Sequence, residues 1–218
     1  MNTELIARDG HRLGAYEQNP DGATRGVVIV QEIFGVNSHI RSVVDRYAAL
    51  GYRAIAPALF DRAEPGVELD YGDGIEKGLE LLAATGDENA VTDIGAAAAH
   101  ISPTGPVAVV GYCWGGLLAW LSAAELPIAA AVGYYGGRIT QYLDRAPACP
   151  ILLHFGDEDA SIPMSDVEQI RAGYPDVPIH VYNAGHGFNC DVRGSYEEAS
   201  AVLALERTLA FLDTNLST

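Results

Sequence analysis

One cysteine lies in a sequence pattern that is typical of enzyme nucleophiles. The segment Val109–Gly116 reads Val-Val-Gly-Tyr-Cys-Trp-Gly-Gly, so Cys113 stands at the centre of a Gly-x-nucleophile-x-Gly motif. A sharp turn there strains the central residue and requires neighbours without side chains, which Gly111 and Gly115 provide. The sulfur would then project at a helix N-terminus, where the helix dipole favours a thiolate. The alternative is a packing turn around an inert cysteine, but an expected strand before the motif and an expected helix after it favour the nucleophile.

A base and an acid for this nucleophile are expected later in the chain, each at the carboxyl end of a strand. His186 lies between two glycines after the apolar run 179–182, a setting that does not suit a core histidine. The acid is expected after the apolar run 151–155, where it would accept the Nδ1–H of the histidine. The residues leave three candidates for this acid: Asp157, Glu158 and Asp159. The other histidines fall at chain-start, helix or strand positions, where we expect structural roles: His11, His39, His100, His154 and His180.

A second carboxylate is expected near the cysteine. Glu32 lies just after the apolar run 27–30, at the sheet edge that must also hold Cys113. Such a position is unusual for ordinary surface charge, although pairing with a nearby arginine to order the loop is an alternative role. The backbone N–H groups of Ile33 and Trp114 are candidates for an oxyanion hole.

The elements that must position these residues alternate along the chain. Continuous β-branched runs suit parallel strands that are covered on both faces. Strand–helix alternation over residues 1–218 therefore predicts a single α/β domain with a mostly parallel, doubly wound sheet flanked by helices. The nucleophile motif and the order of the acid and the histidine after it indicate the α/β-hydrolase fold. The expected strands are 27–30, 52–56, 107–110, 128–134, 151–155 and 179–182, and the expected helices are 38–50, 75–82, 89–101, 115–124 and 196–212. The Gly- and acid-rich segment 61–74 is either a loop over the site or a surface excursion.

Composition excludes several classes of protein. With 49% hydrophobic residues and 19% charged residues, the chain is expected to fold around a sizeable core. A net charge of −16 disfavours binding to nucleic acid or to anionic membranes. No leader or membrane span is visible, so we expect a cytoplasmic protein. Three widely spaced cysteines suit neither a disulfide framework nor a metal site, so we expect no cofactor and treat Cys149 and Cys190 as inert thiols.

Taken together, these motifs resemble the dienelactone hydrolases, also called carboxymethylenebutenolidases, from about residue 9 to residue 212. The resemblance implies a triad of Cys113, His186 and Asp159, and so selects Asp159 among the three acids. It also implies that the resting thiol is neutral and is held toward Glu32. An anionic substrate then displaces this carboxylate, which takes the thiol proton. The shared motifs are 31–37, 111–116, 133–136, 156–159, 185–188 and 206–212.

The expected substrate pocket departs from the family pattern. The best-known members hold a substrate carboxylate with two arginines, and alignment places these positions at Ile75 and Cys190. A pocket without this pair should bind a dicarboxylate-like lactone less well. Basic residues nearby and aromatic residues of the shared motifs are the candidates for substrate binding: Arg62, Lys77, Tyr135, Phe188 and Arg193.

The leading hypothesis is hydrolysis of a small-molecule lactone or carboxylic ester through a cysteine thioester. A general carboxylesterase or thioesterase would use the same residues with a different pocket. A non-catalytic thiol sensor is the alternative from another class of protein. A sensor has no need for a histidine and an acid at the two triad positions, so the sequence favours the enzyme.

Overall fold

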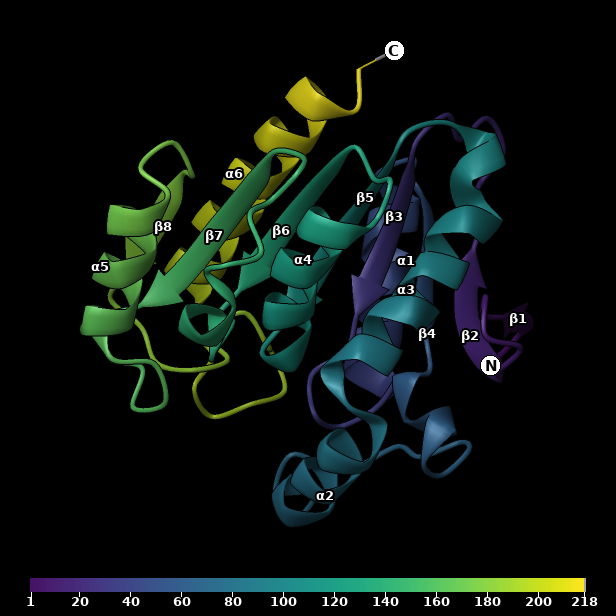
Figure 1. The fold of residues 1–218 in the computed structure, drawn as a ribbon, viewed down its shortest axis with the longest axis horizontal. Helices are drawn as coiled ribbons and strands as arrows, with labels where there is room; N and C mark the ends of the chain where they lie inside the picture. Colours follow the sequence, from purple (N-terminus) through teal and green to yellow (C-terminus); the bar gives the residue numbers. More distant parts are fainter. Residues whose placement is uncertain (218) are drawn as a thin grey trace.

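The predicted α/β-hydrolase fold is confirmed by a computed structural model that describes residues 1–217. One eight-stranded sheet has the order β1-β2-β4-β3-β5-β6-β7-β8 (Figure 1). The strands in the part β4-β3-β5-β6-β7-β8 pair in parallel. At the other edge, β1 pairs antiparallel with β2, and β2 pairs antiparallel with β4. The strands are β1 (Thr3–Ile6), β2 (Arg12–Gln18), β3 (Gly26–Val30), β4 (Arg53–Pro57), β5 (Val107–Tyr112), β6 (Ala130–Tyr134), β7 (Ile151–Gly156) and β8 (Ile179–Tyr182).

Helices cover both faces of the sheet. In Figure 1, α3 and α4 lie in front of the central strands, and α1 and α6 lie behind them. Every residue of β3, β5, β6 and β7 is buried as a result, which explains why these strands read as continuous apolar runs. The helices are α1 (Ser38–Ala49), α2 (Ile75–Thr85), α3 (Asp87–Ile101), α4 (Trp114–Glu125), α5 (Met164–Gly173) and α6 (Glu198–Asn215).

Among the described strands and α-helices, three were not predicted from the sequence, namely β1, β2 and α5. Strand β2 buries Leu13 and Ala15 on one face only, so its sequence alternates and has no apolar run. Helix α5 buries only Val167 and Ile170, which is too narrow an apolar stripe to mark a helix in the sequence. These elements depend on one-sided burial at the margins of the sheet.

The parallel strands point their carboxyl ends toward α2 (Figure 1). Segment 61–74 joins this end of the molecule, because the N–H of Leu69 donates to the carbonyl of Phe34 at 2.9 Å. Glu68 also forms a β-bridge with Gly35. The segment therefore lies against the loop that follows β3. Among the described residues, no helix combines the length and the apolar character that crossing a membrane requires.

Candidate active site

Cys113 occupies a strained turn between β5 and α4. Its backbone angles, φ 56° and ψ −113°, lie where side chains are rarely tolerated. A Cβ atom at Gly111 would collide with the carbonyl of Gly115, so the tight turn requires glycine there. The N–H of Cys113 donates to the carbonyl of Tyr134 at 3.0 Å, and that of Gly115 donates to Gln31 at 3.1 Å. The turn is therefore tied to the loop after β3 on one side and to β6 on the other.

His186 and Asp159 meet at the carboxyl ends of β8 and β7. The Nδ1 atom of His186 lies 2.8 Å from Oδ2 of Asp159. Asp159 is buried, and its other oxygen accepts the N–H of Ser161 at 2.8 Å. The neighbouring acids are exposed, and Glu158 accepts a hydrogen bond from Asn183 at 2.9 Å instead. Of the three acids that the sequence left open, Asp159 is the one placed to orient the histidine.

The electrostatic surroundings of His186 favour its charged form. Burial of the ring opposes protonation, but hydrogen bonds to Asp159 and Cys113 outweigh it and raise the pKa of His186 to about 10. The contact with Cys113 also places the ring beside the sulfur. At neutral pH the charged imidazolium can therefore donate a proton to a group bound in the cavity.

Glu32 is completely buried and has two partners of its own. Its Oε2 atom accepts the O–H of Tyr71 at 2.7 Å, and its Oε1 atom lies 3.3 Å from Nη1 of Arg193. Burial, together with the negative charge of Glu32, raises the pKa of Tyr71, so the phenol remains a donor. Within residues 1–217 no hydrogen bond joins Glu32 to Cys113.

Two backbone N–H groups are free to bind an oxyanion. Ile33 and Trp114 both line the cavity that contains Cys113. In the described part of the chain, neither backbone N–H donates a hydrogen bond. Trp114 begins α4, and the first N–H groups of a helix lack partners within the helix. Its indole ring stacks on Phe60 and donates to Asp87 at 2.7 Å, which fixes the residue in place.

The cavity at Cys113 has a volume of about 380 Å³ and a largely apolar wall. Helix α2 contributes Ile75, Leu79 and Leu82 to this wall. Arg138 and Arg193 add two guanidinium groups to the lining, beside His186. A second hollow of about 480 Å³ surrounds Pro150, and it contains neither Cys113 nor His186. Because it contains both Cys113 and His186, the smaller cavity is the candidate active site.

Of the five residues predicted to bind substrate, Arg193 is the one that lines this cavity. Arg62 forms ion pairs with Asp93 at 2.7 Å and with Asp9 at 2.8 Å. Lys77 forms an ion pair with Glu64 at 2.9 Å. The two aromatic candidates are fully buried behind the histidine. Tyr135 packs edge-on against His186 with ring centroids 5.2 Å apart, and Phe188 packs against Tyr135 at 5.4 Å. These two residues shape the site without reaching the cavity.

Other residues of the site were missed by the sequence analysis. Tyr71 comes from the segment 61–74, which has no periodic pattern. Arg138 follows the shared motif 133–136 and contacts Asp87 at 3.1 Å. Asp87 also accepts the O–H of Tyr142 at 2.7 Å. It therefore connects Trp114, Arg138 and Tyr142 beside the cavity. Arg138 could have been identified as a site candidate from its position shortly after the expected strand 128–134.

Comparison with known proteins places the chain beside hydrolases. The family model described as the dienelactone hydrolase family matches residues 13–216. A carboxymethylenebutenolidase from Pseudomonas putida is 37% identical over 217 residues, which cover 94% of this chain and 92% of the relative. The carboxymethylenebutenolidase from Pseudomonas knackmussii matches with the same identity and coverage.

Solved structures agree with this relationship. A crystal structure from Klebsiella pneumoniae, provisionally named a dienelactone hydrolase, superposes with a TM-score of 0.82 at 34% identity, covering 94% of this chain and 95% of that one. An esterase from Pyrococcus furiosus has a TM-score of 0.73 at 14% identity, with coverage of 99% and 91%. The second likeness concerns the fold alone.

Proposed function

The chain belongs to the dienelactone hydrolase family and is a hydrolase that acts on esters or lactones, and from this premise we propose that it works through a thioester on Cys113. One observation carries the proposal: the strained turn holds this thiol beside the His186–Asp159 pair at a cavity. A thiol with an adjacent base, itself oriented by a carboxylate, is the arrangement of covalent acyl transfer.

The proposed acyl transfer starts once the thiol proton of Cys113 has been removed, with the thiolate beside a protonated His186. The sulfur attacks the carbonyl carbon, and the N–H groups of Ile33 and Trp114 stabilise the resulting oxyanion. As the tetrahedral intermediate collapses, the C–O bond of the ester breaks and His186 gives its proton to the leaving oxygen. The neutral histidine then takes a proton from water, which attacks the thioester and releases the acid and the thiolate.

We assign Glu32 the role of first proton acceptor. Arg193 supports this proposal, because it contacts Glu32 at 3.3 Å and also lines the cavity. An anionic group on the substrate would pair with the guanidinium of Arg193 and weaken its hold on the carboxylate. Glu32 would then be free to take the thiol proton of Cys113. In the absence of such a substrate, the arginine keeps the carboxylate occupied.

A second candidate function is suggested by the apolar wall. Ile75 and Leu79 present exposed aliphatic side chains at the cavity, and Ile75 stands at a position where the family pattern expects arginine. Burial of apolar surface favours a hydrophobic acyl or alcohol group over a second carboxylate. A carboxylesterase for apolar esters therefore uses the same catalytic groups with a different pocket.

A kinetic panel separates these two candidates. We would compare lactones and chromogenic esters with and without a carboxylate near the scissile bond, using the wild type and Arg193→Gln. If Arg193 holds the substrate anion, the variant loses about 10- to 100-fold in kcat/KM on the charged substrates and much less on neutral ones. Arg171→Gln, which removes an exposed pair with Glu168, is the matched control. An equal loss on both substrate classes would assign Arg193 a structural role.

A further inference from the structure

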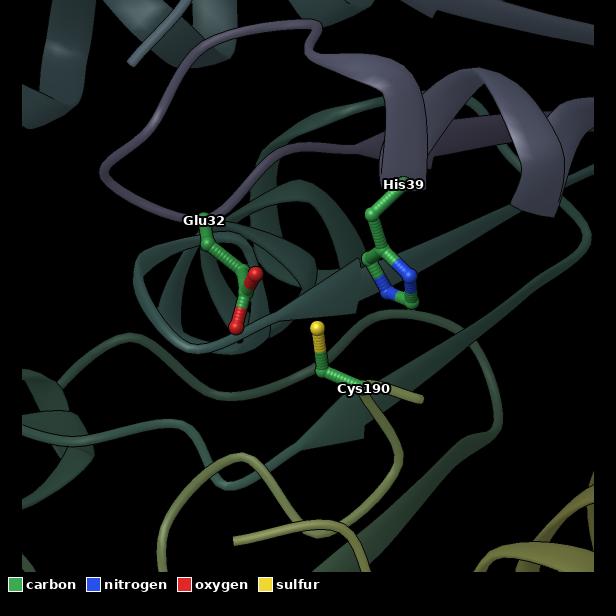
Figure 2. A group of neighbouring side chains, drawn as sticks. All are labelled: Glu32, His39 and Cys190. Atoms are coloured by element: carbon green, nitrogen blue, oxygen red, sulfur yellow. The ribbon is translucent and has the colours of Figure 1, made fainter. Parts of the chain in front are cut away.

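A second group of buried reactive side chains lies beside the catalytic centre. Glu32 from the loop after β3, His39 from the start of α1 and Cys190 from the loop after β8 surround a common space (Figure 2). One ligand atom from each lies within 4.8 Å of the other two. All three residues are buried, with exposed fractions of 0%, 2% and 0%. From the sequence alone, we expected a structural role for His39 and treated Cys190 as an inert thiol.

One nitrogen of the His39 imidazole contacts a carboxylate, and the other has no hydrogen-bond partner in the described residues. Its Nδ1 atom lies 3.1 Å from Oδ1 of Asp191, a contact from which we assign the proton to Nδ1. The Nε2 atom then carries a lone pair, and it is buried with no hydrogen-bond partner in the described residues. Figure 2 shows the ring directed toward the sulfur of Cys190. A histidine whose second nitrogen donates to a carboxylate is the usual form of a metal-ligating histidine.

We propose that Glu32, His39 and Cys190 form a binding site for a divalent ion of the zinc class. A thiolate, an imidazole and a carboxylate together suit Zn²⁺, whereas Mg²⁺ and Ca²⁺ require mainly oxygen ligands. When the ion binds, Cys190 loses its thiol proton to solvent and a metal–sulfur bond forms. The carboxylate and the thiolate then balance the two positive charges of the ion.

Binding of the ion requires the ligand atoms of Glu32, His39 and Cys190 to move slightly closer together. Tetrahedral zinc, with sulfur at about 2.3 Å and nitrogen at about 2.1 Å, places these two ligand atoms about 3.6 Å apart. Side-chain rotations that bring the atoms about 1 Å closer would close the site. Glu32 can keep its hydrogen bonds to Tyr71 and Arg193, because each carboxylate oxygen has a second lone pair. The ion therefore adds to the present contacts without replacing them.

Occupancy of this site would inhibit the enzyme, a consequence that rests on the proposed role of Glu32. A carboxylate bound to zinc no longer accepts the proton of Cys113. Catalysis itself requires only protein groups, so EDTA should leave the activity of metal-free enzyme unchanged. Zinc should lower turnover in a saturable way, and EDTA should restore it.

The test uses Co²⁺ as a spectroscopic probe of chelator-treated protein in the Cys113→Ser background, so that the catalytic thiol does not contribute. We expect one equivalent of Co²⁺ to produce a thiolate charge-transfer band, which Zn²⁺ then displaces. Adding Cys190→Ser should abolish the band, and adding Cys149→Ser, the matched control, should retain it. Asp191→Asn, which alters a half-exposed partner of His39, should weaken Co²⁺ binding about 10- to 100-fold.

The outcomes separate the metal site from the proposed function. Absence of a saturable band, or a band that survives Cys190→Ser, would overturn the site and leave the thioester mechanism untouched. A band that depends on Cys190, together with zinc inhibition of the wild type, supports both. If Co²⁺ binds as expected but zinc leaves ester turnover unchanged, the site stands and the catalytic role of Glu32 falls.

Discussion

The molecule contains two groupings of cysteine, histidine and aspartate, and they differ in their surroundings. In one, Asp159 contacts Nδ1 of His186 at 2.8 Å near Cys113. In the other, Asp191 contacts Nδ1 of His39 at 3.1 Å in the cluster that contains Cys190. The first cysteine sits on a strained turn at a cavity with free N–H donors, and the second is fully buried. The same three residue types therefore occupy two environments that differ in burial and in access to the cavity.

The two thiols differ in chemistry for the same reason. Burial, followed by the negative charge of Glu32, raises the pKa of Cys190 to about 11. That thiol stays protonated at neutral pH unless a cation is bound beside it. Burial alone raises the pKa of Cys149 to about 11. Cys113, by contrast, stands at the N-terminus of α4 and lines the cavity together with His186.

The largest predicted effect comes from removing the cysteine of the first grouping. Cys113→Ala should lower kcat/KM for a chromogenic ester by more than about 10⁴-fold, because it removes the sulfur that forms the covalent intermediate. Cys190→Ala and Cys149→Ala are the matched controls and should keep most of the activity in the same assay. Near-normal turnover by the Cys113 variant would refute the mechanism. A comparable loss in the Cys190 variant would show that the comparison between the two groupings is wrong.

Glu32 lies between the two groupings, and its substitution should have the second-largest effect. Glu32→Gln removes the proton acceptor and should cut kcat by about 10²- to 10⁴-fold while the protein still folds. The competing interpretation is that Glu32 only pairs with Arg193 and orders the loop. In that case the variant melts at a lower temperature and kcat hardly changes. Measurement of kcat and Tm on this one variant distinguishes the two roles.

The smallest effect concerns stability and pH. Since the folded-state pKa of His186 is about 10, above the ordinary value of 6.5, its protonation stabilises the fold fully below about pH 6.5. That contribution is lost as the pH rises toward 10. The difference in unfolding free energy between the wild type and His186→Gln should therefore shrink from pH 6 to pH 10. Chemical denaturation at several pH values measures it, and a constant or growing difference would contradict the assigned charge.

The sequence predicted the centre of the molecule better than its margins. Strands 107–110 and 151–155 were visible because a doubly covered sheet demands continuous apolar runs. Cys113 and Asp159 follow such strands, His186 follows the half-buried edge strand β8, and the structure brings the three together. The contact of Tyr71 with Glu32 joins an irregular loop to a strand end 39 residues away. No local periodicity encodes such a contact, because it depends on how the loop closes over the sheet.

The two groupings also explain why one histidine was identified and the other was not. His186 lies in a glycine-flanked loop, which is a poor place for a structural histidine. His39 lies at the start of a helix, where its side chain has no distinguishing sequence context. Its neighbours Cys190 and Asp191 are more than 150 residues away in the chain. Proximity of that kind comes only from the folded structure.

The central claim is that Cys113 carries the acyl group, and mass spectrometry of the acylated enzyme tests it most directly. Wild-type enzyme would be mixed with a p-nitrophenyl ester, quenched in acid during the first turnover, digested and mapped. The mechanism predicts the mass of the acyl group on the peptide that contains Cys113, with a bond that hydroxylamine cleaves as it does a thioester. A burst of p-nitrophenol with the acyl group on any other residue would contradict the mechanism.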